Sequence, residues 1–445
     1  MESSSVAAEF GAFAIGGGRI PDAVLHQGRR ALLNCLGTAL GSARSSPVER
    51  AARAIQAVSG PGDATVIGRT ERLRAPEAGF VNAIAMNLLD FDDTHLPTIV
   101  HPTSPVAAAA LALGEELGST GAEVLAAIVI GAEIACRTGL MVSPGHYARG
   151  WHITSTCGTF GAAAAAARLL RLTDLQAAHA LGVASSLAAG HVENLPTAGK
   201  NASMGNAVRS GILAAYLARG GFEAAPTALE GRLGWARACG DPPDIERALG
   251  GLGRNWEYGA NAIKPYPCGI VFHAEIDACL DLMRVNTLNA SDIEQVVVEG
   301  DALFLARGDR DVRSAGDARV SLHHVAAVAL LYGRAGVREF EQTCVDAPEV
   351  VAFRSRIRGE LDPSLAPGAA TVELRLRSGQ AVSETVVFAR GSIERPLSDA
   401  EIEEKARGLA EGAGTGTDVS RLAHLVWRLD ALPKVGDLLR ATHPA

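Results

Sequence analysis

Two apolar runs flank a short, strongly polar junction, and this arrangement is the feature that most restricts the fold of the chain. Residues 81–89 form the first run, and the alanine-rich residues 106–113 form the second. Within a dozen residues the junction holds three carboxylates and two imidazoles, which are Asp90, Asp92, Asp93, His95 and His101. Loops held by a rigid scaffold often present catalytic groups. We take Asp93 and His101 as the leading candidates for the centre of a site. In the alternative interpretation, Asp92, Asp93 and Thr94 only cap a helix or turn.

The composition also favours closely packed helices. Hydrophobic residues make up 48% of the chain but aromatic residues only 4%, so alanine, leucine and valine must fill the core. Apolar residues recur at helical spacing in several segments, which are residues 20–42, 47–58, 106–117, 120–136 and 205–219. Thr120 with Glu123, and Ser398 with Glu401, have the spacing of capping boxes and mark two helix starts.

The pattern changes near residue 260. Residues 293–299 read as a strand, and residues 370–377 alternate with period two. A Ser378-Gly379 turn then leads into a second strand over residues 381–388. Helical segments are interspersed here, so this region is α+β in character.

The sequence therefore predicts a mainly α protein with a second, smaller α+β domain. We place the helical domain at residues 1–258 and the α+β domain at residues 259–395. We expect residues 396–445 to return to the helical domain. A length of 445 residues is consistent with two or three domains.

Charge and cysteine usage exclude several classes of protein. The formal net charge is −8 and the chain has no basic block, which argues against a nucleic-acid partner. The seven cysteines are scattered without CxxC spacing, so neither a zinc site nor a cysteine-ligated cluster is indicated. We expect a reduced, cytoplasmic protein. The segment Met1–Ser5 lacks the features of a signal peptide, and we find no stretch of about 18 apolar residues that would span a membrane.

A second polar cluster lies at residues 150–159. His152 precedes a run of hydroxyl residues that opens a helix of small residues. Free backbone N–H groups at a helix start bind anions readily, and a histidine beside them can act as an acid or base. The alternative is an ordinary capped helix in which His152 is incidental.

Two lysines stand in turn-rich loops rather than on amphipathic faces. Lys200 lies in a glycine-flanked loop before a helix, and Lys264 lies in a proline-braced loop with His273 downstream. As compact positive charges they could bind substrate carboxylates; the alternative is an ordinary surface lysine in each case. The pair His323-His324 opens an apolar helix, where a satisfied buried histidine is the competing interpretation.

These segments together resemble the MmgE/PrpD family, which includes 2-methylcitrate dehydratase, cis-aconitate decarboxylase and iminodisuccinate epimerase. The resemblance extends from the helix at Pro21 to the helix at Ser398. It implies a helical domain, a smaller α+β domain and a homodimer that uses neither a metal nor an organic cofactor. The residues that it assigns to catalysis are Asp93, His101, His152, Lys200 and Lys264. Those assigned to substrate binding are Thr94, Thr154, Ser203, His273 and His324.

The chain also departs from the family pattern at four positions. Ile153 stands where a proline is common, Ser203 where histidine or asparagine is common, His324 where decarboxylase-like members have tyrosine, and Val208 where alanine is usual. The resemblance places these positions around the substrate. We expect a freer loop after His152, a larger pocket or a bound water at Ser203 and an imidazole at His324 that can carry positive charge, and hence a preference away from 2-methylcitrate. In the alternative, Ile153, Ser203 and His324 all lie behind the pocket and only repack it.

The expected reaction is the removal of a proton from a carbon beside a carboxylate. Our first choice is a hydro-lyase of a small hydroxy-di- or tricarboxylate, similar to 2-methylcitrate dehydratase, with His152 or His101 as the base and the other as the acid. An epimerase, isomerase or decarboxylase of a related polycarboxylate is the second choice. A metalloenzyme using Asp92, Asp93, His95 and His101, and a non-catalytic binding or scaffold protein, are the remaining alternatives.

Overall fold

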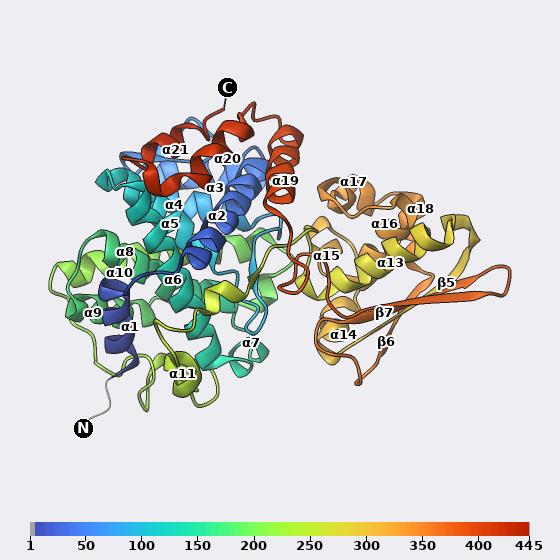
Figure 1. Cartoon of the computed structure of the whole chain (residues 1–445), viewed down its shortest axis with the longest axis horizontal. Coiled ribbons are helices and arrows are strands. Elements are labelled where there is room, and N and C mark those ends of the chain that lie inside the picture. The colour runs from blue at the N-terminus through green and yellow to red at the C-terminus, as the bar shows by residue number, and fades with distance from the viewer. Residues whose placement is uncertain (1–4, 445) are drawn as a thin grey trace. The chain divides into compact units, whose positions relative to one another are not determined.

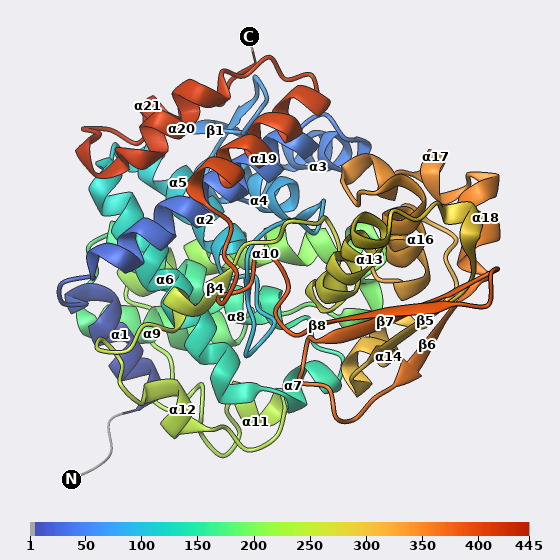
Figure 2. The ribbon, with the colours of Figure 1, turned by 45° about the vertical axis from the view of Figure 1, so that its right-hand side comes forward.

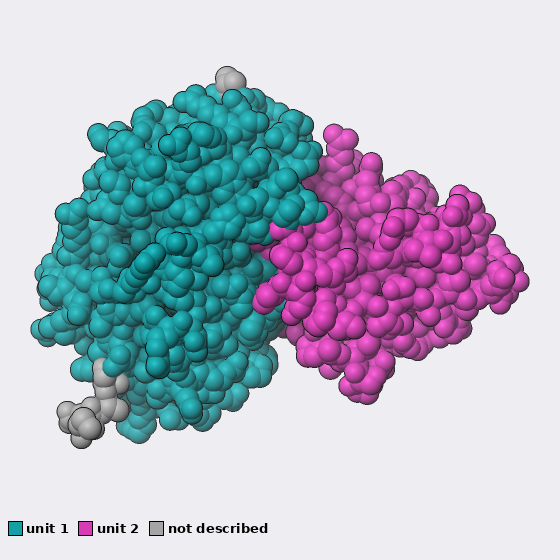
Figure 3. Space-filling model, viewed as in Figure 1, with its two compact units in different colours: residues 1–88, 92–262, 398–445 teal, residues 89–91, 263–397 magenta. Residues whose placement is uncertain are grey.

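The computed structural model describes residues 5–444 and divides the chain into two compact units (Figure 3). Unit 1 contains residues 1–88, 92–262 and 398–445, and unit 2 contains residues 89–91 and 263–397. Residues 1–4, which belong to the segment in which no signal peptide was expected, lie outside the described residues. The sequence analysis placed the main boundaries after residues 258 and 395, whereas the structure places them after residues 262 and 397. The excursion of residues 89–91 into unit 2 was not foreseen.

Unit 1 is almost entirely helical (Figure 1). Its longer helices are α1 (Val6–Gly16), α2 (Asp22–Ser42), α3 (Ser46–Val58), α4 (Ala75–Asn87), α5 (Thr103–Leu117), α6 (Gly121–Val142), α8 (Ile153–Leu169), α9 (Asp174–Ser185), α10 (Ala198–Arg219), α19 (Asp399–Gly412) and α20 (Val419–Trp427). Short helices are α7 (Gly145–Ala148), α11 (Trp235–Cys239), α12 (Ile245–Leu249) and α21 (Gly436–Arg440). Two small antiparallel ladders pair β1 (Pro61–Thr65) with β2 (Arg72–Leu73), and β3 (Thr94–His95) with β4 (Asn261–Ala262).

Small residues let the central helices approach closely. A Cβ atom built on Gly131 of α6 would lie 2.5 Å from the carbonyl oxygen of Gly161 in α8, and one built on Gly161 would lie 2.6 Å from the carbonyl oxygen of Gly131. The alanines that follow Gly161 are buried. Their small side chains bring the two backbones into contact, as the scarcity of aromatic residues indicated.

Helix α6 corrects one expectation. By length and composition it could cross a membrane, although the sequence analysis found no such stretch, but 94% of its most apolar window is buried within the protein. It also carries an internal ion pair between Glu133 and Arg137, both fully buried. A helix that is apolar all round is typical of the centre of a large domain.

The chain ends return to unit 1, as expected. Ser398 and Glu401 form the predicted capping box at the start of α19. This helix lies beside α2, where Asp399 pairs with Arg30 and Lys405 donates to the side chain of Asn34 at 2.6 Å. The capping box predicted at Thr120 and Glu123 is likewise present.

Unit 2 is built on a four-stranded sheet in the order β6-β5-β7-β8. Its strands are β5 (Ile293–Gly300), β6 (Ile357–Leu361), β7 (Ala370–Leu376) and β8 (Ala381–Val386). The predicted hairpin is confirmed, since β7 pairs with β8 antiparallel and Gly379 in the turn has φ +88°. Strand β5 pairs parallel with β6 and antiparallel with β7, a mixed topology that the sequence pattern did not reveal.

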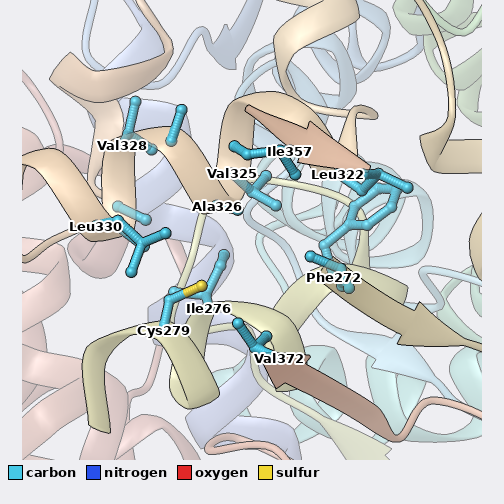
Figure 4. Packing of buried hydrophobic residues seen from close by; sticks show 14 of the residues in the cluster. Phe272, Ile276, Cys279, Leu322, Val325, Ala326, Val328, Leu330, Ile357 and Val372 are labelled. Carbon is cyan, nitrogen blue, oxygen red and sulfur yellow. The ribbon is translucent and has the colours of Figure 1, made fainter. Parts of the chain in front are cut away.

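Helices cover one face of this sheet (Figure 2). The helices of unit 2 are α13 (His273–Asn286), α14 (Ala302–Gly308), α15 (Ala315–Ala318), α16 (Leu322–Tyr332), α17 (Gln342–Val345) and α18 (Pro348–Arg354). Figure 4 shows their contact layer, in which Ile276 and Cys279 of α13 lie near Val372 of β7, and Val325 of α16 lies near Ile357 of β6. Alternate residues of β7 are buried in this layer, so the sheet presents its other face to solvent.

Candidate active site

His101 is held between the β3 loop and the start of α8. Its ring Nδ1 lies 2.8 Å from the backbone carbonyl oxygen of Asp93 and 3.1 Å from the hydroxyl of Thr94. Its backbone N–H donates to the hydroxyl of Thr154 at 3.1 Å. Because a carbonyl oxygen can only accept, Nδ1 must carry the proton, and the lone pair of the neutral ring is on Nε2. The predicted residues Thr94 and Thr154 therefore contact His101 directly.

The Asp93 carboxyl group, in contrast, faces protein donors. Thr103 and the amide of Asn261 both donate to Oδ2, and the thiol of Cys35 donates to Oδ1 at 3.5 Å. The hydroxyl of Tyr258 lies 2.8 Å from the hydroxyl of Thr103 and belongs to the same buried hydrogen-bonded cluster. Burial, together with the nearby charge of Asp92, raises the pKa of Asp93 to about 6, although the two donors on Oδ2 oppose that shift.

This geometry fits an imidazole-orienting role for Asp93. The residue is fully buried and positions His101 through its backbone carbonyl, while its carboxyl group ties β3 to β4 and α5. Of the four ligands considered for a metal site, Asp93 has both carboxyl oxygens in hydrogen bonds with protein donors.

Asp92 lies near the same ring nitrogen of His101 as the Asp93 carbonyl. Its Oδ2 accepts hydrogen bonds from Asn87 at 2.9 Å and from Ser104 at 2.6 Å. Its Oδ1 lies 3.6 Å from Nδ1 of His101 and has no hydrogen-bond partner among residues 5–444. A buried carboxylate at this distance stabilises positive charge on the imidazole.

His152 forms a second cluster at the first turn of α8. Its Nδ1 lies 3.2 Å from the Ser155 hydroxyl and 3.4 Å from the Ser203 hydroxyl. Ser155 donates its proton to the His152 carbonyl and Ser203 donates its proton to the Lys200 carbonyl. Since each hydroxyl has only one proton, Nδ1 of His152 must be the donor to them, and its lone pair is on Nε2. The predicted residue Ser203 thus orients His152 rather than only widening a pocket.

Lys200 stands at the start of α10, where it is 7% exposed. The next residue, Asn201, donates to Asn87 at 3.1 Å, and Asn87 donates to Asp92. This chain of amides links the start of α10 to the His101 cluster. Unit 1 therefore brings Thr94, His101, His152, Thr154, Lys200 and Ser203 into one connected region.

Two of the departures from the family pattern have structural explanations in unit 1. Ile153 is the first residue of α8 and is buried, a position that proline also tolerates, so we find no freer loop there. Val208 is buried between α10 and α4, where a Cβ atom on Gly79 would lie 2.6 Å from its methyl carbon. Val208 is thus a helix-packing residue and does not surround a substrate as expected.

In unit 2, Lys264 is 1% exposed and contacts Asp90. Its ammonium nitrogen lies 3.1 Å from the carbonyl oxygen and 3.4 Å from the Oδ1 atom of Asp90. Asp90 has φ +52°, which is uncommon for a residue other than glycine. Strained backbone conformations of this kind are concentrated at functional sites. Sequence reasoning counted Asp90 in the acidic junction but did not select it, because nothing local distinguishes it from Asp92 and Asp93.

The other two predicted residues of unit 2 lie in its interior. His273 begins α13 with its ring edge-to-face against Tyr266, the ring centroids being 5.3 Å apart. His324 is fully buried; its Nε2–H donates to the carbonyl of Glu339 at 2.8 Å, and Arg354 donates to its Nδ1 at 3.4 Å. Burial lowers the pKa of His324 to about 4. The charged imidazole expected at this position is therefore wrong, because the ring is neutral and both nitrogens are engaged.

A cavity of about 490 Å³ lies elsewhere in unit 1. It is lined by the end of α9 and the segment before α11, including Ser185, Thr227, Arg232 and Trp235. None of the predicted site residues lines it. The polar region described above is thus defined by its connected side chains and not by this cavity.

Two adjacent family models match the chain. Residues 14–248 match the MmgE/PrpD N-terminal domain, and residues 266–431 match the MmgE/PrpD C-terminal domain. The chain belongs to the MmgE/PrpD family. The boundary between the matched segments falls close to the division between units at residue 262, and the helical and α+β architecture predicted from the family resemblance is confirmed.

Curated relatives of this MmgE/PrpD protein align with it over nearly its whole length. It is 27% identical to cis-aconitate decarboxylase of Homo sapiens over an alignment of 431 positions, which covers 93% of this chain and 89% of the relative. It is 27% identical to cis-aconitate decarboxylase of Aspergillus terreus over an alignment of 452 positions, gaps included, which covers 94% of this chain and 92% of the relative. A cis-aconitate decarboxylase-like protein of Aspergillus oryzae is 25% identical over 455 aligned positions, which cover 94% of this chain and 93% of the relative. The chain is therefore an enzyme of the family, related to its dehydratases and decarboxylases.

Proposed function

We propose that this enzyme is a hydro-lyase that removes water from a small hydroxy-di- or tricarboxylate, in the manner of 2-methylcitrate dehydratase. The observation that carries the proposal is the fixed orientation of two histidines. Nδ1 of both His101 and His152 is hydrogen-bonded to protein groups, and we assign proton exchange with the substrate to Nε2 of each ring. Elimination of water needs one base and one acid. The two rings differ in their surroundings: Nδ1 of His152 contacts hydroxyl groups, whereas Nδ1 of His101 lies near the carboxylate of Asp92.

His152 suits the role of base. Its Nδ1 contacts two neutral hydroxyls, those of Ser155 and Ser203. These partners hold the ring without stabilising an extra positive charge on it as a carboxylate would. The neutral imidazole then takes a proton through Nε2 from the carbon next to a substrate carboxylate.

His101 suits the role of acid. The Asp92 carboxylate, 3.6 Å from Nδ1, stabilises the ring when both nitrogens are protonated. In that form Nε2–H is the donor, while Nδ1–H remains bound to the carbonyl of Asp93. A histidine with a buried carboxylate behind it is well placed to protonate a leaving hydroxyl.

The elimination step balances with these two groups. The C–H electron pair becomes the new C=C bond as the proton moves to His152. The C–O bond on the neighbouring carbon breaks, and the hydroxyl leaves as water with the proton from His101. Lys200, and Lys264 by the family resemblance, neutralise substrate carboxylates and the charge that grows beside them in the transition state. Solvent returns the proton between turnovers.

Decarboxylation is the second candidate, favoured by the names of the relatives in Homo sapiens and Aspergillus terreus. In that reaction the bond to a departing carboxylate breaks, carbon dioxide leaves, and the electron pair takes a proton from an acid. The same histidines and lysines could serve it, so product analysis must decide.

The test is incubation with 2-methylcitrate, citrate, cis-aconitate and succinate-type acids in deuterated water, followed by NMR. We expect a hydroxy-polycarboxylate to yield an unsaturated acid with no carbon lost. Formation of carbon dioxide from an unsaturated acid would replace the proposal with a decarboxylase. Deuterium incorporation at one carbon without elimination would indicate an epimerase, and inertness toward the whole panel would reject polycarboxylate chemistry.

Two variants separate the acid from the base. His152→Gln should lose both elimination and deuterium exchange, by about 100- to 10,000-fold. His101→Gln should lose elimination by a similar factor but keep exchange, because the base is intact. His424→Gln on the exposed face of α20 is the matched control and should behave as wild type. Loss of exchange in His101→Gln with exchange retained in His152→Gln would reverse the assignment.

A further inference from the structure

Residues Leu89–Phe91 belong to unit 2, although the chain on both sides of them belongs to unit 1. At their centre Asp90 holds the positive φ angle and contacts Lys264. A strained residue in a three-residue excursion keeps its conformation only if the surrounding structure imposes it. Something in unit 2 must therefore hold this segment in place.

Arg319 makes the contacts that can do so. Its Nη1 donates to the carbonyl of Leu89 at 2.8 Å and to the carbonyl of Pro267 at 2.6 Å. These acceptors are the residue before Asp90 and a residue of the loop that carries Lys264. The carbonyl of Arg319 itself accepts from the backbone N–H of Gly269 at 2.9 Å, which fastens the same loop a second time.

We propose that Arg319 is a positioning residue that clamps Asp90 and Lys264 into one active geometry. The role rests on the proposed function, in which Lys264 binds a substrate carboxylate. One guanidinium nitrogen joins the two segments that carry the pair. Its loss would remove the hydrogen bonds that join the backbone before Asp90 to the loop that carries Lys264.

The side chain chemistry of arginine fits this task better than that of lysine. The guanidinium group is planar and presents its N–H donors in a fixed geometry, so two carbonyls can be held at a defined separation. The ring of Phe340 lies 5.5 Å from the guanidinium carbon and supports it from another side. The carboxylates of Asp90 and Glu341 are the negative groups that act on Arg319; the buried thiol of Cys268 is also near, and burial raises its pKa so that it stays neutral.

Arg319 also sets the local charge. Lys264 and Arg319 contribute two positive charges, and Asp90 and Glu341 contribute two negative charges when all four groups are ionised. Arg319 therefore helps to balance the acidic groups around Lys264 in addition to holding the loop in place.

The first measurement needs no substrate. Amide hydrogen exchange in Arg319→Lys and Arg319→Ala should be about tenfold or more faster in peptides covering residues 86–92 and 262–270, with the strands β5 and β7 unchanged. Arg356→Lys and Arg356→Ala are matched controls, because Arg356 donates to the carbonyl of Ile293 at 2.9 Å and packs on Phe353 in the same unit. They should leave both peptides at wild-type rates.

The second measurement is turnover on the best acid from the substrate panel. Arg319→Lys and Arg319→Ala should lower kcat by about 100-fold, the size of effect that misplacement of a catalytic group by about 1 Å can cause, while both Arg356 variants stay near wild type at a similar melting temperature. Guanidinium chloride at a non-denaturing concentration should restore part of the activity of Arg319→Ala, and sodium chloride should not.

The outcomes separate the two proposals. Unchanged exchange in both peptides overturns the clamp whatever the substrate proves to be. Faster exchange with wild-type turnover also overturns it, because the held geometry would then not matter to the reaction. Faster exchange in a protein that acts on none of the acids leaves the clamp in place and rejects the proposed function.

Discussion

Buried acidic side chains of the two units differ in how fully their oxygens are hydrogen-bonded. In unit 1, Asp93 accepts from Thr103, Asn261 and Cys35, and Glu133 accepts from Arg137 and the backbone N–H groups of residues 257 and 258. Asp277 and Glu339 of unit 2 have donors of their own, but Glu275 does not. In unit 2, Glu275 of α13 is fully buried, and neither of its oxygens has a hydrogen-bond partner in the described chain. Asp90 pairs there with Lys264 from a strained backbone.

The number of hydrogen-bond donors around a buried carboxylate indicates whether its role is structural or functional. A buried carboxylate surrounded by donors holds its neighbours in place and has little capacity left for a substrate. A carboxylate that is strained or lacks donors has not been arranged for stability alone. The acidic junction contains both kinds only three residues apart, at Asp93 and Asp90.

The largest expected effect tests the Asp90–Lys264 pair. Lys264→Ala should lower kcat/KM because the activation barrier rises by about 2–4 kcal/mol, the usual cost of losing one electrostatic donor. Lys200→Ala in unit 1 should have an effect of the same size. Because Lys264 is 1% exposed and paired, its removal should also destabilise unit 2 by leaving Asp90 without its partner. Turnover and urea unfolding of each variant are the measurements.

A double variant sharpens this result. Lys264→Ala with Asp90→Asn should recover most of the lost stability, since no uncompensated charge remains, but none of the lost activity. Wild-type turnover in both lysine variants would mean that neither cation acts on substrate. If the double variant is as unstable as Lys264→Ala, the pair is not what stabilises this part of unit 2.

A smaller effect is expected at Asp93, and it depends on pH. The pKa of Asp93 is raised from 3.8 to about 6, so folding favours its protonated form. Stability from this group is fully present below about pH 4 and is lost as pH rises through about 6, a change of about 3 kcal/mol at most. Asp93→Asn should lack this loss, so its stability relative to wild type should improve steadily between pH 4 and 7.

Activity provides the second half of that test. Since the Asp93 carboxyl group faces protein donors and its backbone carbonyl orients His101, Asp93→Asn should keep turnover within about tenfold of wild type by our assignment. A loss of several hundredfold without a change in stability would mean that the carboxyl group contacts substrate, and the contrast with Asp90 would disappear.

Local sequence patterns predicted much of the helical architecture. The helix expected at residues 20–42 is α2, and the capping boxes at Thr120 and Ser398 begin α6 and α19. The β7–β8 hairpin followed from alternation and a Ser-Gly turn. In these cases the spacing of residues close in sequence decides the structure.

Long-range pairing could not be predicted in this way. The parallel pairing of β5 with β6 joins segments more than fifty residues apart, and no local pattern specifies a register across that distance. The same limit affected the site. Asp93 meets Asn261, which lies 168 residues later, whereas Asp90 meets Lys264, which lies 174 residues later. From the sequence alone, the two carboxylates are equivalent members of one acidic stretch.

His324 shows a different limit. Its position at the start of an apolar helix fitted both a functional and a buried role, and the burial that decides between them depends on Arg354 and Glu339, which lie elsewhere in unit 2. The structure brings His101 and His152 into one connected region of unit 1, and their tautomers follow from the carbonyl and hydroxyl partners of Nδ1.

The smallest expected effect concerns Glu275 and completes the contrast between the units. Burial raises the pKa of Glu275 well above 4.5. Folding therefore favours the protonated acid: the stability from Glu275 is fully present below about pH 4.5 and is lost as pH rises toward its folded pKa. Glu275→Gln is neutral in both states and should avoid that loss, being more stable than wild type by about 1–2 kcal/mol at pH 8 and similar to it near pH 4.5. Urea unfolding from pH 4.5 to 8 measures the difference, with Glu133→Gln in unit 1 as the opposite case, expected to be destabilising because it breaks a buried pair with Arg137. If Glu275→Gln is destabilising at every pH, the carboxyl group has donors in solution after all, and the two units bury their acids alike.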